Sequence, residues 1–517
     1  MLLFLTMAIR ISNYQNNESI NVSLPLISGE IIAGKDSKIS IKNLTSASKQ
    51  IVWPVINGRF KALIPLKLGK NEIELRYKNS IKLFSLNYKP LINKRFIRLV
   101  YIKCKDDPGL FQSPVEEDNS IDSACKRISL AGRMLQTFTL DKLREHNLKG
   151  KSFRLEEINE DIKCHVFTSS LSLKEAYCLN EQELWSHFAV ELMNSSLRIG
   201  NRCKFLAFLS FTRYINNSND IPKNHQEVLN LTKGQVALGG GGLALFGSGC
   251  LHTWPETIQE IPWRFGDNRK VDRMKLMDDS ANRGFYWACY STGLGAALHE
   301  LGHTFDLGHT HGGIMGRGFD DIHKYFIIDM FYKNHIFQQE HNPYYQPSNH
   351  DCTVELTLTS PTSVSEPDEK YLAELSKVAV SSDLPDFSSD QTAWKLPNPP
   401  DTDVERGRLA VNVGGAYWSR SSALILYFHK WFNDVEEEVK RDSISLQGTE
   451  IVSSNSIKII EFRDQEGTSF HHLEFLEETD IFKLNLASIN LSEYVLEDIK
   501  EILIVVEDIF GNLMKSK

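Results

Sequence analysis

The feature that most constrains the fold of this 517-residue chain is a run of eleven residues that begins at His299 and ends at His309. It reads His-Glu-Leu-Gly-His-Thr-Phe-Asp-Leu-Gly-His. On a helix, residues four apart share a face, so His299 and His303 can direct their imidazoles to one point, with Glu300 beside it. Three imidazoles leave one position of a zinc ion open, and an adjacent carboxylate suits hydrolysis. The competing interpretation is an amphipathic helix with solvated or hydrogen-bonded histidines.

The third histidine joins the other two only if the helix stops soon after His303. A residue in the left-handed conformation ends a helix in this way, and Gly is the usual choice. The chain has Asp306 where the pattern HExxHxxGxxH has Gly. Since Asp and Asn tolerate a positive φ better than other side chains, we expect the turn to form with some strain. We expect Gly308 to add freedom just before His309.

The longer run HELGHTFDLGHTHGGIMGRGFDD resembles the metzincin clan of zinc metallopeptidases. It is most similar to a little-characterised family of zinc metallopeptidases in fungi and animals. The matching residues are His299, Glu300, His303, His309 and Met315. The resemblance implies one Zn²⁺ ion held by the three histidines and activating a water, with Glu300 as the general base. It also implies a Met-turn that places Met315 beneath the metal.

Two other ligand sets stay open at this point. His311 lies eight residues after His303 rather than six, so it ranks below His309 as the third ligand. Alternatively, a downstream carboxylate such as Glu340 completes a site of two histidines and one glutamate. The presence of both His309 and Met315 favours the first set. We interpret His323 and His341 as surface or locally hydrogen-bonded residues.

The composition is that of an ordinary globular protein, with 41% hydrophobic and 24% charged residues. A net charge of −8 gives no basic surface for nucleic acid, and no run of 18 apolar residues predicts a membrane span. The eight cysteines are scattered without a pairing pattern. We therefore expect a cytoplasmic protein, with secretion as the alternative, and the sequence makes no prediction of oligomeric state.

Changes in pattern along the chain divide it into four parts. Short apolar runs between Asn, Gly and Ser clusters predict an immunoglobulin-like β-sandwich over residues 1–90. Residues 91–378 form the expected metzincin-like peptidase domain, whose implied fold is α/β. A Pro- and Ser-rich linker is expected over 379–403, and a second β-sandwich-like, β-rich domain over 404–517.

Alternating strands and helices are predicted in the central part. The predicted strands cover residues 95–102, 152–158 and 203–211. The predicted helices cover residues 120–148, 173–193 and, around the histidines, 292–305. In the C-terminal part, the apolar run at 423–428 is interpreted as a strand.

A glycine-rich segment at 237–249 precedes the histidine helix. It lacks the Gly-Lys-Ser/Thr ending of a phosphate-binding loop. We interpret it as a strand or bulge at the edge of a cleft. The resemblance places the substrate-binding edge strand in this region, which makes Gly240, Gly241, Gly242 and Leu243 candidate substrate-binding residues. A plain flexible turn is the alternative.

The leading hypothesis is a zinc endopeptidase that acts on a peptide or protein substrate, with Glu300 transferring the proton. Arg317 is a candidate second donor to the oxyanion. The alternative is a multidomain binding scaffold that keeps zinc only for stability. An aminopeptidase is a weaker third reading, because it needs an acidic anchor for the substrate amine that the sequence does not reveal.

Overall fold

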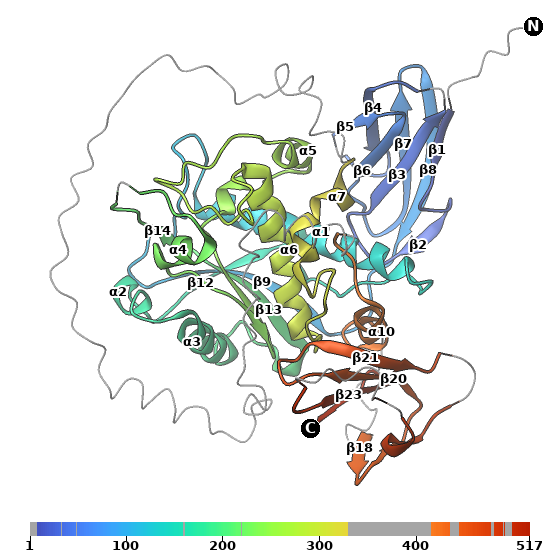
Figure 1. Ribbon diagram of the computed structural model, residues 1–517. Coiled ribbons are helices and arrows are strands. Elements are labelled where there is room, and N and C mark those ends of the chain that lie inside the picture. Colours follow the sequence, from blue (N-terminus) through green and yellow to red (C-terminus); the bar gives the residue numbers. More distant parts are fainter. Residues whose placement is uncertain are drawn as a thin grey trace, which may run out of the picture.

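The computed structural model describes residues 8–328, 415–434 and 444–517, apart from residues 33, 48, 159–160, 219, 477–479, 490 and 492–498. An N-terminal sheet, a central α/β core and a C-terminal β region follow one another along the chain (Figure 1). The predicted linker at 379–403, Glu340 and His341 lie outside the described residues.

The N-terminal region is a single eight-stranded sheet in the order β1-β3-β6-β5-β4-β7-β8-β2. Its strands are β1 (Ala8–Ile11), β2 (Glu18–Ile20), β3 (Leu26–Ile32), β4 (Ser37–Asn43), β5 (Ile51–Ile56), β6 (Arg59–Leu63), β7 (Gly69–Tyr77) and β8 (Ser80–Tyr88). Buried and exposed residues alternate along β7, so one face of the sheet covers a core that includes Trp53. β1 and β8 lie close together. The immunoglobulin-like topology stays a prediction.

The central core contains a five-stranded sheet in the order β12-β9-β13-β17-β16. The strands are β9 (Phe96–Lys103), β12 (Cys164–Thr168), β13 (Cys203–Leu209), β16 (Ala237–Gly240) and β17 (Leu243–Gly247). The first four in that order run parallel, and β16 pairs with β17 in the antiparallel sense at one edge. That edge strand contains part of the glycine-rich segment singled out above.

Helices cover both faces of this sheet (Figure 1). α1 (Ile121–Arg144) and α6 (Tyr286–Thr304) pack on one face, where Leu206 and Phe208 of β13 point. α2 (Leu173–Ala176) and α3 (Glu181–Met193) pack on the other face, against Phe205 and Leu209. Because β13 is buried on both faces, its sequence is almost continuously apolar.

The structure confirms two of the predicted central strands and two long helices, with altered limits. The helix predicted at 173–193 is two helices, because Asn180 forms a capping box with Glu183 and starts α3 anew. The strand predicted at 152–158 is wrong. Leu155 makes only one bridge, to Ile97, and the following short strands β10 (Glu157–Ile158) and β11 (Asp161–Ile162) pair with each other.

Short elements fill the connection between β13 and α6 and the segment after α6. They are β14 (Arg213–Tyr214), α4 (His225–Asn230), β15 (Thr232–Lys233), η2 (Leu251–Thr253), η3 (Ile258–Glu260), α5 (Ile261–Phe265), η4 (Arg317–Asp321) and α7 (His323–Phe326), whereas η1 (Gly200–Arg202) immediately precedes β13. Of these, η4, α5 and η2 contact α6 directly. α6 itself begins at Tyr286, six residues before the predicted start.

The C-terminal region begins with a helix, where the sequence predicted a strand. Residues 423–428 belong to α10 (Arg420–Phe428), which Ser419 caps by accepting a hydrogen bond from the backbone N–H of Ser422. The prediction is wrong because a short, uniformly apolar run fits a buried helix as well as a buried strand. α10 packs against α1 and β20.

Two further sheets follow α10, in the orders β18-β19-β22 and β21-β20-β23-β24. Their elements are β18 (Ile444–Gln447), β19 (Glu450–Ser453), β20 (Ile457–Arg463), β21 (Ser469–Glu474), β22 (Lys483–Asn485), η7 (Leu486–Ser488), β23 (Leu503–Asp508) and β24 (Leu513–Ser516). The four-stranded sheet lies at the C-terminal end of α6 (Figure 1).

Within the described ranges, no helix combines the length and apolar character needed to cross a bilayer. The seven cysteines in those ranges are all free thiols. The eighth, Cys352, lies outside them.

Candidate metal site

The first two histidines of the motif lie one turn apart on α6, near its C-terminal end. Their Nε2 atoms are 3.0 Å apart, and His299 is fully buried. This convergence follows from the four-residue spacing. The helix is buried almost throughout, so the imidazoles face protein interior rather than solvent.

A sharp turn brings the third histidine to the same point. Asp306 follows the helix with φ at +66°, in the left-handed region. That conformation costs a residue with a Cβ roughly 1–2 kcal/mol relative to the right-handed one. The turn leaves His309 with its ring 4.8 Å from that of His303 and 5.3 Å from that of His299. One ligand atom from each of the three histidines lies within 4.8 Å of the others.

Backbone carbonyls fix the protonation of two of these rings. His299 Nδ1 lies 2.7 Å from the carbonyl oxygen of Ile314, and His303 Nδ1 lies 2.9 Å from that of Leu307. A carbonyl only accepts, so each Nδ1 carries the proton and each Nε2 presents a lone pair. Two lone pairs 3.0 Å apart repel each other unless a cation lies between them. The donor set therefore fits a metal ion, and imidazole nitrogen is a preferred zinc ligand.

Burial keeps the three rings in the neutral form that binds metal. Burial, with a smaller effect of neighbouring His309, lowers the pKa of His299 to about 3. Burial, together with the two other histidines, lowers the pKa of His303 well below its ordinary value. The same cause, reinforced by Arg463, lowers the pKa of His309 to about 4.

The Glu300 carboxylate is buried beside this cluster. The residue has no solvent exposure, and neither carboxylate oxygen completes a hydrogen bond of ordinary geometry to a described residue. Burial raises the pKa of Glu300 well above its usual range, and the backbone N–H of Gly239 opposes part of that rise. A buried carboxylate with so few partners among the described residues is costly, and a carboxylate held in this way beside three imidazoles is suited to proton transfer.

Met315 lies against the helix that carries the histidines. A Cβ on Gly302 would be 2.6 Å from Met315 Sδ, so the thioether occupies the space that a side chain at Gly302 would need. The loop closes on itself where the backbone N–H of Thr310 donates to the carbonyl of Met315 at 2.9 Å. The same loop presents the Ile314 carbonyl to His299.

The edge strand β16 lies directly on α6. A Cβ on Gly239 would meet the backbone oxygen of Glu300 at 2.0 Å, so only Gly allows the two backbones to come this close. Of the candidate substrate-binding residues, Gly240 ends β16, whereas Gly241 and Gly242 form the turn to β17. Leu243 is not at the edge, because β17 pairs with β13 on one side and β16 on the other.

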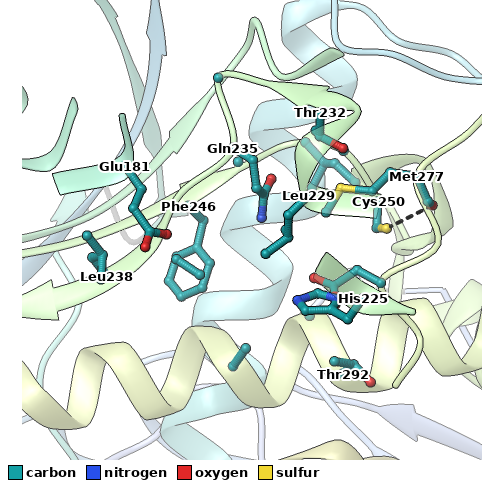
Figure 2. A pocket seen from close by; sticks show the side chains of 18 of the residues that line it. Glu181, His225, Leu229, Thr232, Gln235, Leu238, Phe246, Cys250, Met277 and Thr292 are labelled. Carbon is teal, nitrogen blue, oxygen red and sulfur yellow. Dashed lines mark hydrogen bonds and ion pairs between the residues drawn. The ribbon is translucent and has the colours of Figure 1, made fainter. Parts of the chain in front are cut away.

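A cavity of about 580 Å³ is lined by residues of α6 and of the β16–β17 hairpin, and none of the three histidines lines it. Phe319 lines it, and the Phe319 ring lies 5.4 Å from the ring of His299. Figure 2 shows Glu181 and Phe246 toward one end of the cavity and His225 toward the other, with Gln235 between them. These residues come from segments far apart in the sequence, and no local motif marks them.

Arg317 also lines this cavity, and its guanidinium donates to Asp320 at 3.1 Å. His311 is exposed and is not part of the histidine cluster. His323 is buried, with Ser291 Oγ 2.8 Å from its Nδ1, as expected for a locally hydrogen-bonded residue.

Comparison with known proteins gives the following matches. The family model described as "Metallopep: Putative peptidase family" matches residues 8–398. A Saccharomyces cerevisiae protein named as a putative zinc metalloproteinase is 26% identical over 314 residues, which cover 54% of this chain and 44% of that protein. A Schizosaccharomyces pombe protein of the same description is 26% identical over 344 residues, which cover 62% and 54%. The chain thus spans about half the length of these curated relatives.

Among solved structures, wild-type OgpA of Akkermansia muciniphila is 12% identical with a TM-score of 0.39, covering 82% of this chain and 92% of that chain. Catalytic inactive OgpA in complex with an O-glycopeptide substrate gives the same identity, TM-score and coverage. A likeness this loose does not indicate a shared site or substrate.

Proposed function

Because the chain belongs to the Metallopep putative peptidase family, we propose that it is a zinc metalloendopeptidase whose single Zn²⁺ ion binds to His299, His303 and His309. The observation that carries the proposal is the arrangement of the nitrogens. Two Nδ1 atoms are committed to carbonyls, so the Nε2 lone pairs converge on one buried point. The two fungal relatives named as zinc metalloproteinases support the choice of metal.

A bound zinc ion would supply Lewis-acid chemistry, lowering the pKa of water and polarising a carbonyl. Glu300 then moves the proton. One carboxylate oxygen takes it from the attacking water and later delivers it to the nitrogen of the leaving amine. Its burial raises its basicity, against a smaller opposing effect of the Gly239 N–H, which supports this role. Met315 holds the histidine loop against α6 and transfers no proton.

The edge of β16 is the proposed binding site for an extended substrate. In an antiparallel pair of strands, every second residue directs its backbone N–H and carbonyl toward the partner strand. Val236 is such a residue, because its carbonyl accepts a hydrogen bond from the backbone N–H of Gly247. By this alternation Ala237 and Gly239 direct their backbone groups away from β17, toward the outer edge, where the Gly239 N–H faces Glu300. A peptide paired there would run past Glu300 and place a side chain in the adjoining cavity, with the Gly240–Gly242 turn at one end.

The test is a comparison of wild type with Glu300→Gln on casein and on a peptide library. We expect the variant to keep stoichiometric zinc and to lose hydrolysis by about 100-fold or more. Glu501→Gln, which changes an exposed glutamate far from the histidines in sequence, is the matched control. A wild-type protein that holds zinc but cleaves nothing would contradict the proposal and favour the binding scaffold.

One observation requires the experiment to test for an aminopeptidase as well. Glu181 faces the cavity and is close enough to Glu300 to raise its pKa, so it offers an acidic group to a substrate amine. The library should therefore contain free and acetylated N-termini. An endopeptidase cleaves both, whereas an aminopeptidase cleaves only the free form. We also propose a cytoplasmic location, which the free thiols of the described residues support.

A further inference from the structure

The turn that carries the third histidine is bonded to residues of the C-terminal region. The backbone N–H of His309 donates to the carbonyl of Gly467 at 3.1 Å, and the carbonyl of His309 accepts from the N–H of Ser469 at 2.8 Å. These two bonds form a parallel bridge to the loop between β20 and β21. The position of His309 relative to α6 therefore depends on a hairpin more than 150 residues further along the chain.

Asp306 is held from the same side. Its backbone oxygen accepts a hydrogen bond from Arg463 Nη2 at 2.7 Å. Its carboxylate lies 3.1 Å from Lys515 Nζ on β24 and 3.4 Å from His429 Nε2 after α10. A left-handed Asp is unfavourable by itself, and these contacts stabilise the conformation that turns the chain toward the metal.

Gly308 shows how closely the two regions fit. A Cβ there would lie 2.5 Å from Arg463 Nε and 2.6 Å from the carbonyl oxygen of Gly467. The φ of Gly308 is not in the left-handed region. The expectation that Gly308 gives the backbone conformational freedom before His309 is therefore wrong. Gly308 instead allows the hairpin to touch the ligand turn.

A second contact reaches His299. The backbone N–H of Ile314 donates to the carbonyl of Tyr417 at 2.8 Å, and the carbonyl of the same Ile314 faces His299 Nδ1. Residues from the C-terminal region thus fix the backbone that orients two of the three imidazoles. All of these residues lie beyond the segment that matches the family model, which ends at residue 398.

We propose that the C-terminal region is a structural part of the metal site rather than a separate binding module. Within it, Lys515 and Arg463 are positioning residues that act through Asp306 to set the place of His309. This inference rests on the proposed function, because it takes the three histidines as the metal ligands. It predicts that the affinity for metal depends on side chains far from the motif.

The experiment measures zinc affinity by chelator competition on the purified full chain, together with the visible absorption spectrum of the Co²⁺-substituted protein. Lys515→Ala should weaken zinc binding about 10-fold, as loss of an outer-shell partner of a metal site does. Its side chain is 27% exposed, so the substitution is compatible with folding. Lys515→Arg should restore the affinity, because it keeps the charge opposite Asp306. Lys517→Ala is the matched control, since Lys517 directly follows β24 and pairs with Glu501 in an exposed position.

Asp306→Asn tests the route of the effect. Asn tolerates the same positive φ, so this variant removes the charge and keeps the turn. If Lys515 acts through Asp306, the effects of Lys515→Ala and Asp306→Asn on zinc affinity should not add. The double variant should then bind zinc no more weakly than whichever single variant binds it less tightly. An unchanged Co²⁺ spectrum and zinc affinity in Lys515→Ala would overturn the inference. A wild-type chain that binds no zinc would instead overturn the proposed function, so the two failures are distinguishable.

Discussion

The contact between Gly239 and Glu300 gives a sharp test of how the site is built. In Gly239→Ala, the added Cβ would lie 2.0 Å from the backbone oxygen of Glu300 and 2.6 Å from its carbonyl carbon. Both neighbours are backbone atoms of a buried helix, so no side chain can rotate away. Either β16 or the turn of α6 that holds Glu300 must therefore move to remove the clash.

The adjacent Gly240 provides the matched control. A Cβ there would meet only Trp185 Cζ2, at 3.7 Å, which is an ordinary contact. Both substitutions reduce the freedom of the unfolded chain equally, so their difference isolates the clash. We expect Gly239→Ala to lower the free energy of unfolding by about 3 kcal/mol, the upper end for overpacking, and Gly240→Ala to change it by less than about 0.5 kcal/mol.

Urea unfolding measures the difference as a shift of the midpoint at constant m value. Peptidase activity measured under native conditions should fall in Gly239→Ala as well, because the displaced atoms include those that position Glu300. A Gly239→Ala midpoint equal to that of Gly240→Ala, together with the activity of the wild type, would refute the claim that β16 and α6 are in backbone contact.

Three further predictions concern the packing of Met315, the stabilisation by zinc and the pH dependence of stability. Gly302→Ala places a Cβ 2.6 Å from Met315 Sδ, the end of a flexible side chain, so we expect a loss of only about 1 kcal/mol in urea unfolding. The cost of the Gly302 substitution should disappear when it is made in a Met315→Ala background. Zinc at 1,000 times its Kd should stabilise the wild type by about 4 kcal/mol against the chelated protein, and His309→Ala should lose most of this difference. Burial alone would raise the pKa of Glu117, but hydrogen bonds and ion pairs, chiefly with Arg264, lower it to about 2, so its stabilisation is present above pH 4.5 and is lost as the pH falls toward 2. Unfolding of zinc-free wild type and Glu117→Gln should therefore differ at pH 7 and converge in acid, and a difference that persists at pH 2 would contradict this assignment.

The part of the site that could be predicted from the sequence is the part built by local geometry. Spacing on one helix brings His299 and His303 together without any knowledge of the rest of the chain. The preference of Asp for the left-handed region made a turn at position 306 foreseeable, and the structure has it. The central alternation of strands and helices was also readable, because β13 is buried on both faces and α1 has a strong helical period.

What the sequence could not supply is contact between distant segments. Nothing in the sequence near Gly308 indicates that Arg463 will lie against it. The sequence analysis therefore explained this glycine by backbone freedom, whereas its role is to leave space for Arg463 and Gly467. The apolar run at 423–428 became a helix because it packs on α1 and β20, which a periodicity argument cannot see. The sequence analysis placed Leu243 at the substrate-binding edge, and this was wrong. Gly241 and Gly242 form a turn that carries the chain from β16 into β17, and only the pairing of the two strands reveals that turn.

The hydrogen bond from Arg463 to Asp306 spans 157 residues of sequence, and this has a consequence for the order of events during synthesis. Long-range contacts of this kind form late, after the intervening chain has been made and folded. A nascent chain that has passed residue 310 carries all three histidines, yet the hairpin that seats His309 has still to leave the ribosome. The three histidines therefore reach the observed geometry only after the β20–β21 hairpin has been synthesised and has folded against the turn.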